Sequence, residues 1–292
     1  MPLLLVPTPL GNLGDVTLRA IETLRSADVI VAEDTRVARK LCSALGITAK
    51  AFWSYREQNA LAVTAGIIER AREERVALVT DAGMPSISDP GSDLVAAARA
   101  AGVAVEVLPG PSAALGVAVL SGFSLRRFAF EGFPPRGSSA RREAFTAALR
   151  ANMTTIWYES PKRAGDTLRD LASVAPDARV FLVREYTKRF EEQLLGTPDE
   201  VAAQLLEPVR GEIAFAVAPY DAPRGAPPSD APEDTDAAID ALLAQGLAVG
   251  EIAKRLARRG VGERRELYAR ASERKRARGM GTPSAAEEAS FE

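Results

Sequence analysis

The stretch that decides the fold is VALVTDAGMPSISDPG, residues 76–91, in which an apolar run leads into a long loop. Val76–Thr80 is uninterrupted, which is typical of a strand buried on both faces of a sheet. The loop that follows is rich in turn-forming residues and longer than a simple connection requires. Because α/β sheets bind ligands beyond the carboxyl ends of their strands, this loop is predicted to line a ligand site, with a surface loop capped by Asp89 as the alternative.

The same arrangement, an apolar run followed by a loop with glycine and proline, occurs twice more in the first half of the chain. Leu3–Val6 precedes the loop at residues 7–15, and Val103–Leu108 precedes the loop at residues 108–114. Neither loop contains the G-x-G-x-x-G of a dinucleotide site. Strands that alternate with helices indicate an α/β domain with a mainly parallel sheet, in which the three loops share one edge and form one face of a cleft.

The strand–helix pattern restarts after Gly122 and runs to about Tyr220, which predicts a second α/β unit. A segment rich in Pro, Ala, Gly and Asp follows, and beyond it are short helical patterns and a polar tail of small residues. The predicted organisation is two α/β domains, a linker, a small helical domain and a disordered tail, at residues 1–122, 123–220, 221–235, 236–278 and 279–292.

Composition excludes several kinds of chemistry. The 292 residues include one cysteine, Cys42, and no histidine, so an intrachain disulfide, a cysteine-rich zinc site and histidine-dependent catalysis or metal binding are excluded. Hydrophobic residues at 47% and charged residues at 26% are typical of a globular protein. The apolar start lacks the basic flank of a signal peptide, and no apolar run reaches the roughly 20 residues that span a bilayer, so a cytoplasmic protein without membrane contact is expected.

Several motifs, taken in order, resemble those of the small-subunit ribosomal RNA cytidine 2′-O-methyltransferases, a branch of the tetrapyrrole methylases. They cover about residues 3–218 and lie at 6–15, 32–36, 80–91, 109–112, 130–136, 158–163, 184–188 and 211–213. The resemblance implies two α/β domains of the tetrapyrrole-methylase type with S-adenosylmethionine bound in the cleft between them, and it implies a homodimer. It also implies the substrate, a decoding-centre cytidine in the 16S ribosomal RNA of the small ribosomal subunit.

By the same resemblance, the cofactor is expected to contact both α/β domains, mostly through backbone groups in the first. A carboxylate near the sulfonium would be favourable, although Glu131 and Glu159 could instead form ordinary salt bridges with arginines. The implied cofactor-binding residues are Pro9, Asp81, Ala82, Gly83, Ser86, Ser112, Ala113, Glu131, Gly132, Tyr158, Glu159, Gly211, Glu212 and Ile213.

Methyl transfer to a ribose hydroxyl is an in-line displacement that requires alignment, exclusion of water and removal of the hydroxyl proton. Asp34, Glu185 and Lys188 are the candidate catalytic groups, with Asp15 as a further candidate. Glu185 and Lys188 are three residues apart and could simply pair with each other.

One segment departs from the pattern of the family that the chain resembles. That family usually carries histidines at the positions that correspond to residues 54–59, where Arg56 and Gln58 stand here. A histidine base is therefore excluded, and either the base lies elsewhere or none is required. Arg56 could still contact phosphate.

Arginines in the motif loops and a basic C-terminal region are the candidates for contact with RNA phosphates. Between Glu251 and Gly279 eleven basic residues stand against four acidic ones, in a pattern that indicates the start of a helix-turn-helix. Solvated surface charge on a helical appendage is the alternative. The candidate RNA-binding residues are Arg36, Arg56, Arg136, Arg163, Arg255, Arg258 and Arg259.

Two other functions stay open from the sequence. The chain could methylate a small molecule, a tetrapyrrole precursor, or it could be a relative that binds RNA without catalysis. The basic C-terminal region weighs against the first, and the intact cofactor loops weigh against the second.

Overall fold

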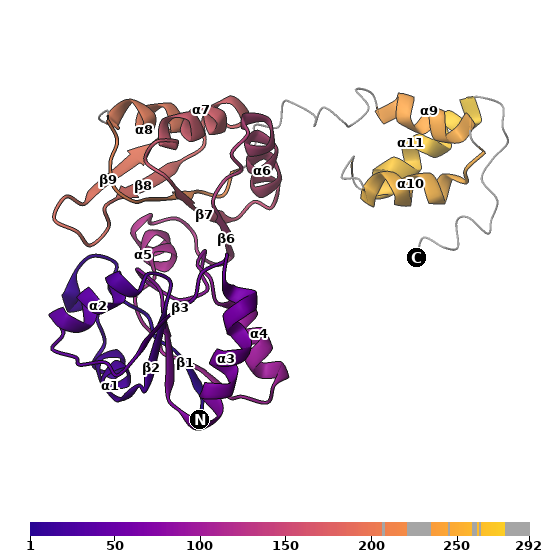
Figure 1. Ribbon diagram of the computed structural model, residues 1–292. Helices are drawn as coiled ribbons and strands as arrows, with labels where there is room; N and C mark the ends of the chain where they lie inside the picture. The colour runs from indigo at the N-terminus through magenta and orange to yellow at the C-terminus, as the bar shows by residue number, and fades with distance from the viewer. Residues whose placement is uncertain (206–207, 221–234, 245, 259–261, 263, 278–292) are drawn as a thin grey trace. The chain divides into compact units, whose positions relative to one another are not determined.

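The computed structural model describes residues 1–205, 208–220, 235–244, 246–258, 262 and 264–277. The chain forms two compact units, Met1–Tyr220 and Asp221–Glu292 (Figure 1). The predicted linker 221–235 lies outside the described residues except for Thr235, and the predicted tail 279–292 lies wholly outside them.

The first half of the larger unit is built on a parallel sheet with the strand order β3-β2-β4-β1-β5. Its strands are β1 (Leu3–Leu5), β2 (Val29–Ala32), β3 (Phe52–Ser54), β4 (Val76–Val79) and β5 (Val105–Val107). Helices lie between the strands and cover both faces of this sheet: α1 (Leu18–Ser26), α2 (Thr35–Ala44), α3 (Ala60–Glu73) and α4 (Ser92–Ala100), with a short 3-10 turn, η1 (Leu13–Asp15), before α1.

Alternate residues of β1, β2 and β4 enter different cores, which explains their continuous apolar runs. In β4, Ala77 and Val79 pack with residues of α1 and α2, whereas Val76 and Leu78 pack with residues of α3 and α4. A strand buried on both faces has no polar side, so it reads as an unbroken hydrophobic stretch. The parallel register, with Leu4 opposite Ala77, brings the carboxyl ends of β1, β4 and β5 to one edge.

The second half of the larger unit is a mixed sheet with the order β6-β7-β10-β8-β9, in which only β6 and β7 run parallel. Its strands are β6 (Phe128–Gly132), β7 (Thr154–Glu159), β8 (Val180–Arg184), β9 (Glu192–Gly196) and β10 (Ile213–Val217). One face is covered by α6 (Ser138–Arg150), α7 (Ala164–Val174) and α8 (Pro198–Gln204).

Helix α5 (Ala113–Leu120) joins the two halves (Figure 1). It follows β5 of the first sheet in the chain, yet its buried residues Ala114, Val117 and Ala118 pack against Ile156 and Phe181 of the second sheet. The face of the second sheet opposite α6–α8 is thus covered by a helix from the first half of the chain. Because α5 packs on the second sheet, residues 1–220 form one compact unit.

The described residues of the smaller unit include the helices α9 (Thr235–Ala244), α10 (Val249–Arg258) and α11 (Arg264–Ala277). Ile239, Ile252, Leu256 and Leu267 belong to its own apolar core. The fold class expected from the sequence, two α/β parts with a helical C-terminal region, is confirmed. None of the helices in the described part of the chain combines the length and apolarity that a membrane crossing requires.

Candidate active site

A cavity of about 410 Å³ opens where the loops of the first sheet meet the strand ends of the second. This volume lies in the range of small-molecule sites, about 300–1,000 Å³. The first half of the chain contributes Leu10, residues 81–84, residues 87–89, Ser112 and Ala113, and the second half contributes Phe133, residues 158–161, Val183, Tyr186 and residues 212–214.

The loop after β4 owes its shape to several residues in the left-handed backbone region. Gly83 has φ +80°, and the non-glycine residues Ser86 and Ser88 have φ +70° and +64°. Gly83 pairs with Thr8 of the first loop through two backbone hydrogen bonds of 3.0 Å. Because a non-glycine residue in this region carries backbone strain, and strain concentrates at functional sites, the loop geometry supports a ligand-binding role.

Acidic side chains gather at the first-half side of the cavity. Asp81 and Asp89 line it, and burial raises the pKa of each carboxyl, with nearby carboxylates adding to the effect. Burial likewise raises the pKa of Glu33, and the nearby carboxylates of Asp89 and Asp81 raise it further. The cavity therefore favours a cationic ligand, because a positive charge would relieve the repulsion among these groups.

Asp34 lies beside this cluster, at the N-cap of α2. Its carboxylate accepts hydrogen bonds from the backbone and side chain of Arg36, and these bonds hold the pKa of Asp34 well below its usual range. Its own backbone N–H donates to Asp81 Oδ1 at 3.2 Å. Arg56 lies 4.0 Å from the Asp34 carboxylate and donates to the backbone oxygen of Glu33.

An aromatic wall closes the second-half side. Tyr158 accepts a hydrogen bond of 3.1 Å from the backbone N–H of Ala114 at the start of α5, which ties β7 to that helix. Phe130 and Phe133 meet the Tyr158 ring edge-on, with ring centroids 4.8 and 5.7 Å away. Phe133 lines the cavity with about half of its surface exposed, so a flat ligand has an aromatic surface to pack against.

The turn between β8 and β9 reaches the first half of the chain. Lys188 donates to Glu185 Oε1 at 2.9 Å and to Glu212 Oε2 at 2.8 Å, and the backbone N–H of Glu212 donates to Glu185. The Lys188 stem lies so close to Gly11 that a Cβ added there would overlap Lys188 Cγ. Tyr186 lies similarly close to Gly116 of α5, where an added Cβ would fall 2.5 Å from the tyrosine ring.

The hydrogen bonds of Glu185 and Lys188 determine the charge state of each group. Burial alone would raise the pKa of Glu185, but the hydrogen bonds from Lys188 and the Glu212 backbone lower it overall. Burial alone would lower the pKa of Lys188, but its two carboxylate partners raise it overall. Both groups thus favour their charged forms, and the mutual pairing considered from the sequence is present in the structure.

The residues expected to bind the cofactor divide into two groups. Those that line the cavity are Asp81, Ala82, Gly83, Ser112, Ala113, Tyr158, Glu159, Glu212 and Ile213, whereas Pro9, Ser86, Glu131, Gly132 and Gly211 do not line it. Pro9 is buried, and Gly211 lies against Glu185. Glu131 is exposed at a register shift in β6, between Phe130 and Gly132.

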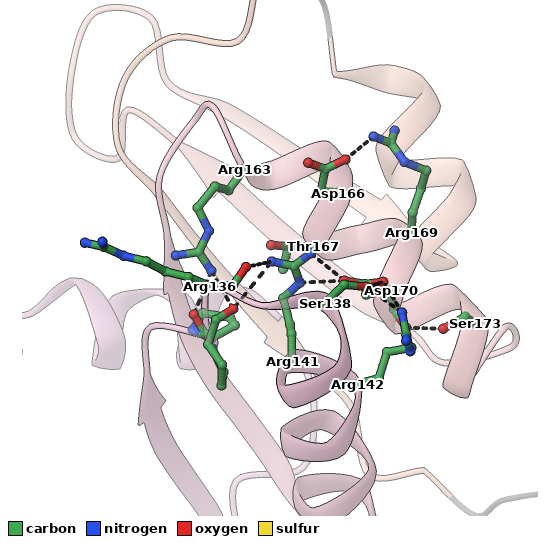
Figure 2. A network of polar contacts seen from close by, with 12 residues as sticks. Arg136, Ser138, Arg141, Arg142, Arg163, Asp166, Thr167, Arg169, Asp170 and Ser173 are labelled. Carbon is green, nitrogen blue, oxygen red and sulfur yellow. Dashed lines mark hydrogen bonds and ion pairs between the residues drawn. The ribbon is translucent and has the colours of Figure 1, made fainter.

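The expected RNA contacts also differ in their surroundings. Arg36 and Arg56 are exposed near the acidic side of the cavity, and Arg136 is exposed in the loop after β6. Arg163 instead points inward, where it pairs with Glu159 at 3.2 Å and donates to the backbone oxygens of Pro134 and Pro135 (Figure 2). Glu159 thus forms the salt bridge with an arginine that the sequence analysis left open as an alternative.

In the smaller unit, Arg255 is exposed on α10 and Arg258 lies in the last turn of that helix, whereas Arg259 lies outside the described residues. Three acid–base contacts tie α11 to α9: Arg270 and Arg274 pair with Asp236, and Arg274 pairs with Asp240. Part of the basic charge of this region thus has a structural use. Lys254, beside Arg255, is also exposed.

Some cavity residues were not singled out from the sequence. Asp89 was considered only as a helix cap, and Phe133 and Tyr186 stood within motifs without a role. The family resemblance pointed to Glu131 and Gly132 in β6, where the register shifts, but it is Phe133, directly after that strand, that lines the cavity. Phe133 could have been found as an apolar residue in a turn-rich segment, where burial in a core is not expected.

Comparison with known proteins defines the class. Residues 2–202 match the family described as Tetrapyrrole (Corrin/Porphyrin) Methylases, and the chain belongs to this family. Solved structures share the fold: diphthine synthase, with a TM-score of 0.58 and 17% identity, and uroporphyrin III C-methyl transferase from Thermus thermophilus, with a TM-score of 0.55 and 20% identity. Each match covers 75% of this chain, and 90% and 97% of the respective solved chains.

Within the family, the chain is similar to curated proteins with one shared name, ribosomal RNA small subunit methyltransferase I. The protein of that name from Halalkalibacterium halodurans is 44% identical over 74% of this chain and 75% of its own length. The one from Thermotoga maritima is 42% identical over 68% of this chain and 89% of its own length. The one from Bacillus subtilis is 41% identical over 74% of each chain.

Proposed function

We propose that this protein is a ribosomal RNA methyltransferase that transfers a methyl group from S-adenosylmethionine to the ribose 2′-hydroxyl of a decoding-centre cytidine in 16S ribosomal RNA. The observation that carries the proposal is the convergence of the three strand-end loops and the second sheet on one cavity. The similarity to proteins named ribosomal RNA small subunit methyltransferase I supports the choice of substrate.

The residues of the cavity fit this methyl donor. Asp81 and Asp89 suit a cationic sulfonium, and their raised pKa values mean that a cation would relieve an unfavourable local charge. Phe133 and Tyr158 offer aromatic surface for an adenine, and the backbone at Ala82, Gly83 and Ala113 offers polar groups. When bound, S-adenosylmethionine supplies an electrophilic methyl group at its sulfonium.

The chain's own residues would align the hydroxyl and exclude water. Asp34 and Glu185, with lowered pKa values, are weak proton acceptors, and Lys188 with its raised pKa remains protonated. The hydroxyl proton is therefore released to solvent once the oxygen carries the methyl group, which leaves a neutral thioether in place of the sulfonium. We assign these three groups an electrostatic and orienting role beside the cavity, in which Lys188 holds Glu185 and Glu212 across from Gly11. This assignment needs no histidine, which the chain lacks.

The small ribosomal subunit is the proposed partner, and RNA phosphate is the proposed contact of the exposed arginines. Arg36, Arg56 and Arg136 in the larger unit and Arg255 on α10 present guanidinium groups to the surface. A guanidinium binds phosphate bidentately, which suits it to an RNA backbone. A homodimer that acts in the cytoplasm completes the proposal, by analogy with the family.

The test is methyl transfer from labelled S-adenosylmethionine to small ribosomal subunits that lack the modification, with a tetrapyrrole precursor offered in parallel. Label in the RNA and none in the tetrapyrrole is expected. Label in the tetrapyrrole alone would establish a small-molecule methylase instead. Cofactor binding without transfer to either substrate would favour an RNA-binding relative that has lost catalysis.

A further inference from the structure

The loop between β6 and α6, residues 133–137, is held from inside by two arginines. Arg163 donates to the backbone oxygens of Pro134 at 2.6 Å and Pro135 at 3.0 Å. Arg141 donates to those of Pro135 at 3.4 Å and Arg136 at 3.3 Å. Figure 2 shows both guanidinium groups beneath the same turn. Three successive carbonyls of the loop are thus fixed by side chains from α6 and from the start of α7.

Each of these arginines is itself fixed by a buried carboxylate. Arg141, 5% exposed, donates through Nε to Asp170 at 2.7 Å, and Ser138 donates to the same carboxylate at 2.7 Å. Glu159, 3% exposed, pairs with Arg163 at 3.2 Å and accepts hydrogen bonds from Thr167 and the backbone N–H of Ser160. Buried charges persist when they are paired and hydrogen-bonded, so both arginines are locked in one orientation.

The loop that these two arginines hold carries one residue that lines the cavity and another that faces solvent. Phe133, at its start, lines the cavity and contacts the Tyr158 ring. Arg136, three residues on, is exposed to solvent. Between them stand two prolines, whose rings restrict the backbone and leave no N–H to donate. The carbonyl contacts are therefore what orients this segment relative to β7 and α7.

We propose that Arg163 is a positioning residue that holds Phe133 against the ligand in the cavity and does not contact RNA. The proposal rests on the proposed function, since it takes the ligand to be S-adenosylmethionine. Glu159 contributes to this positioning because it pairs with Arg163. Arg141, paired with Asp170, holds the carbonyls of Pro135 and Arg136 in the later part of the loop.

Arg163 makes all three contacts, with two carbonyls and one carboxylate, through a single nitrogen, Nη2. This nitrogen stands one bond farther from the backbone than the Nζ of a lysine, so a lysine at this position does not reach the same place.

The experiment compares Arg163→Lys with Arg169→Lys in the full-length protein. Arg163→Lys keeps a positive charge beside Glu159, but its nitrogen ends one bond short of the position that Nη2 occupies. Arg169 is an exposed residue of α7 whose side chain pairs with exposed Asp166 (Figure 2). Calorimetry with S-adenosylmethionine should show that Arg163→Lys raises the Kd about tenfold, the size expected for a displaced aromatic side chain, and that Arg169→Lys leaves it unchanged.

Three further readouts separate positioning from other roles. Hydrogen exchange of the ligand-free protein should accelerate in Arg163→Lys alone at the Arg141 amide, which donates to the backbone oxygen of Gly137 at the end of the loop. Phe133→Ala should raise the Kd similarly, and the double variant should be no worse than Phe133→Ala, because both changes remove one interaction. The salt dependence of binding to small subunits should be unchanged in Arg163→Met, which removes the charge, and lowered in Arg136→Ala.

An unchanged Kd and unchanged exchange in Arg163→Lys would overturn the proposal, as would a lowered salt dependence in Arg163→Met, which would make Arg163 a phosphate contact. If the wild-type protein failed to bind S-adenosylmethionine, the proposed function would fail, while the exchange data would still decide whether Arg163 holds the loop. If Arg163→Lys failed to fold, additive effects of Phe133→Ala and Arg141→Lys on the Kd would count against the proposal, and non-additive effects would support it.

Discussion

At the scale of single residues, the carboxylates of the cavity control which ligand charge is favoured. Asp81 and Asp89 have pKa values raised mainly by burial, so they take up protons at a higher pH than ordinary aspartates, whose pKa is about 3.9. A cationic ligand binds best when both are ionised. The affinity for such a ligand is therefore highest above the raised pKa values and is lost as the pH falls through them.

We accordingly expect the affinity for S-adenosylmethionine to decline on acidification, starting above the pH range in which an ordinary aspartate titrates. Calorimetry over a pH series measures this decline. The variant Asp89→Asn should bind more weakly at neutral pH and show a shallower decline, because one of the titrating groups is gone. An affinity that stays constant while the fold remains intact would show that these carboxylates do not face the cationic part of the ligand.

A second prediction concerns Gly11, over which Lys188 lies. The variant Gly11→Ala would place a Cβ where Lys188 Cγ lies and force the lysine away from Glu185 and Glu212. We expect methyl transfer to fall by about tenfold or more, since misplacement of about 1 Å near a reacting centre can cost on the order of a hundredfold. Single-turnover assays measure the effect.

The matched control is Gly66→Ala in α3, where a Cβ would meet only the Trp53 ring at an ordinary 3.5 Å. This change should leave methyl transfer unaltered and raise the free energy of unfolding by about 0.5–1 kcal/mol, because alanine is the better helix former. If Gly11→Ala were as active as this control, the Lys188 cluster would have no part in the reaction.

The sequence predicted the loops of the candidate site better than the individual side chains. Asp81, Gly83 and Ser112 could be found because each follows a strand of the parallel sheet, where ligand sites form. Phe133 was given no role, and only its apolar character in a turn-rich segment just after β6 could have marked it. The interior position of Arg163 depends on carbonyls of Pro134 and Pro135, distant in sequence, and no local pattern records such an interaction.

At the scale of secondary-structure elements, α5 is the helix on which the two halves depend. Its Val117 is fully buried against the second sheet, whereas Val119 on the opposite face is 71% exposed. The alternation of strands and helices predicted the first sheet, since parallel strands covered on both faces form continuous apolar runs. The sheet on which α5 packs could not be predicted, because its almost wholly apolar sequence does not specify a partner.

The two valines give a prediction with an internal control. Val117→Ala removes two buried methyl groups and should lower the free energy of unfolding by about 1–3 kcal/mol, from lost burial and the cavity left behind. Val119→Ala should change it by less than about 0.5 kcal/mol, because an exposed side chain gains little from folding. Urea denaturation measures both. Equal effects of the two substitutions would contradict the packing of α5 described above.

At the scale of the whole molecule, the larger unit carries the proposed catalytic site, and exposed cations of both units are the proposed RNA contacts. The basic excess of the C-terminal region was evident from composition, but its separation into structural and exposed cations required the structure. Arg270 and Arg274 bind the aspartates of α9, whereas Lys254 and Arg255 are exposed on α10. Which arginines pair within the unit depends on how α9 and α11 pack, which their sequences alone do not determine.

The variant Lys254→Ala/Arg255→Ala should weaken binding to small subunits and lower the slope of log affinity against log salt by about one for each phosphate that the protein no longer binds. Affinity for S-adenosylmethionine should stay unchanged, because neither residue lines the cavity. In contrast, Arg274→Ala should lower the thermal stability of the helical unit, since it removes a partner of Asp240 and one of the arginines that pair with Asp236. An unchanged salt slope in the double variant would refute RNA contact by this face of α10.

Mass spectrometry of nucleosides from treated 16S ribosomal RNA decides whether the proposed reaction takes place. Small subunits that lack the modification are incubated with the protein and S-adenosylmethionine, and their RNA is then digested and analysed. We predict one new methylated nucleoside, 2′-O-methylcytidine, from a decoding-centre fragment. A methyl group on a base, on another nucleoside, or nowhere in the RNA would contradict the proposed function.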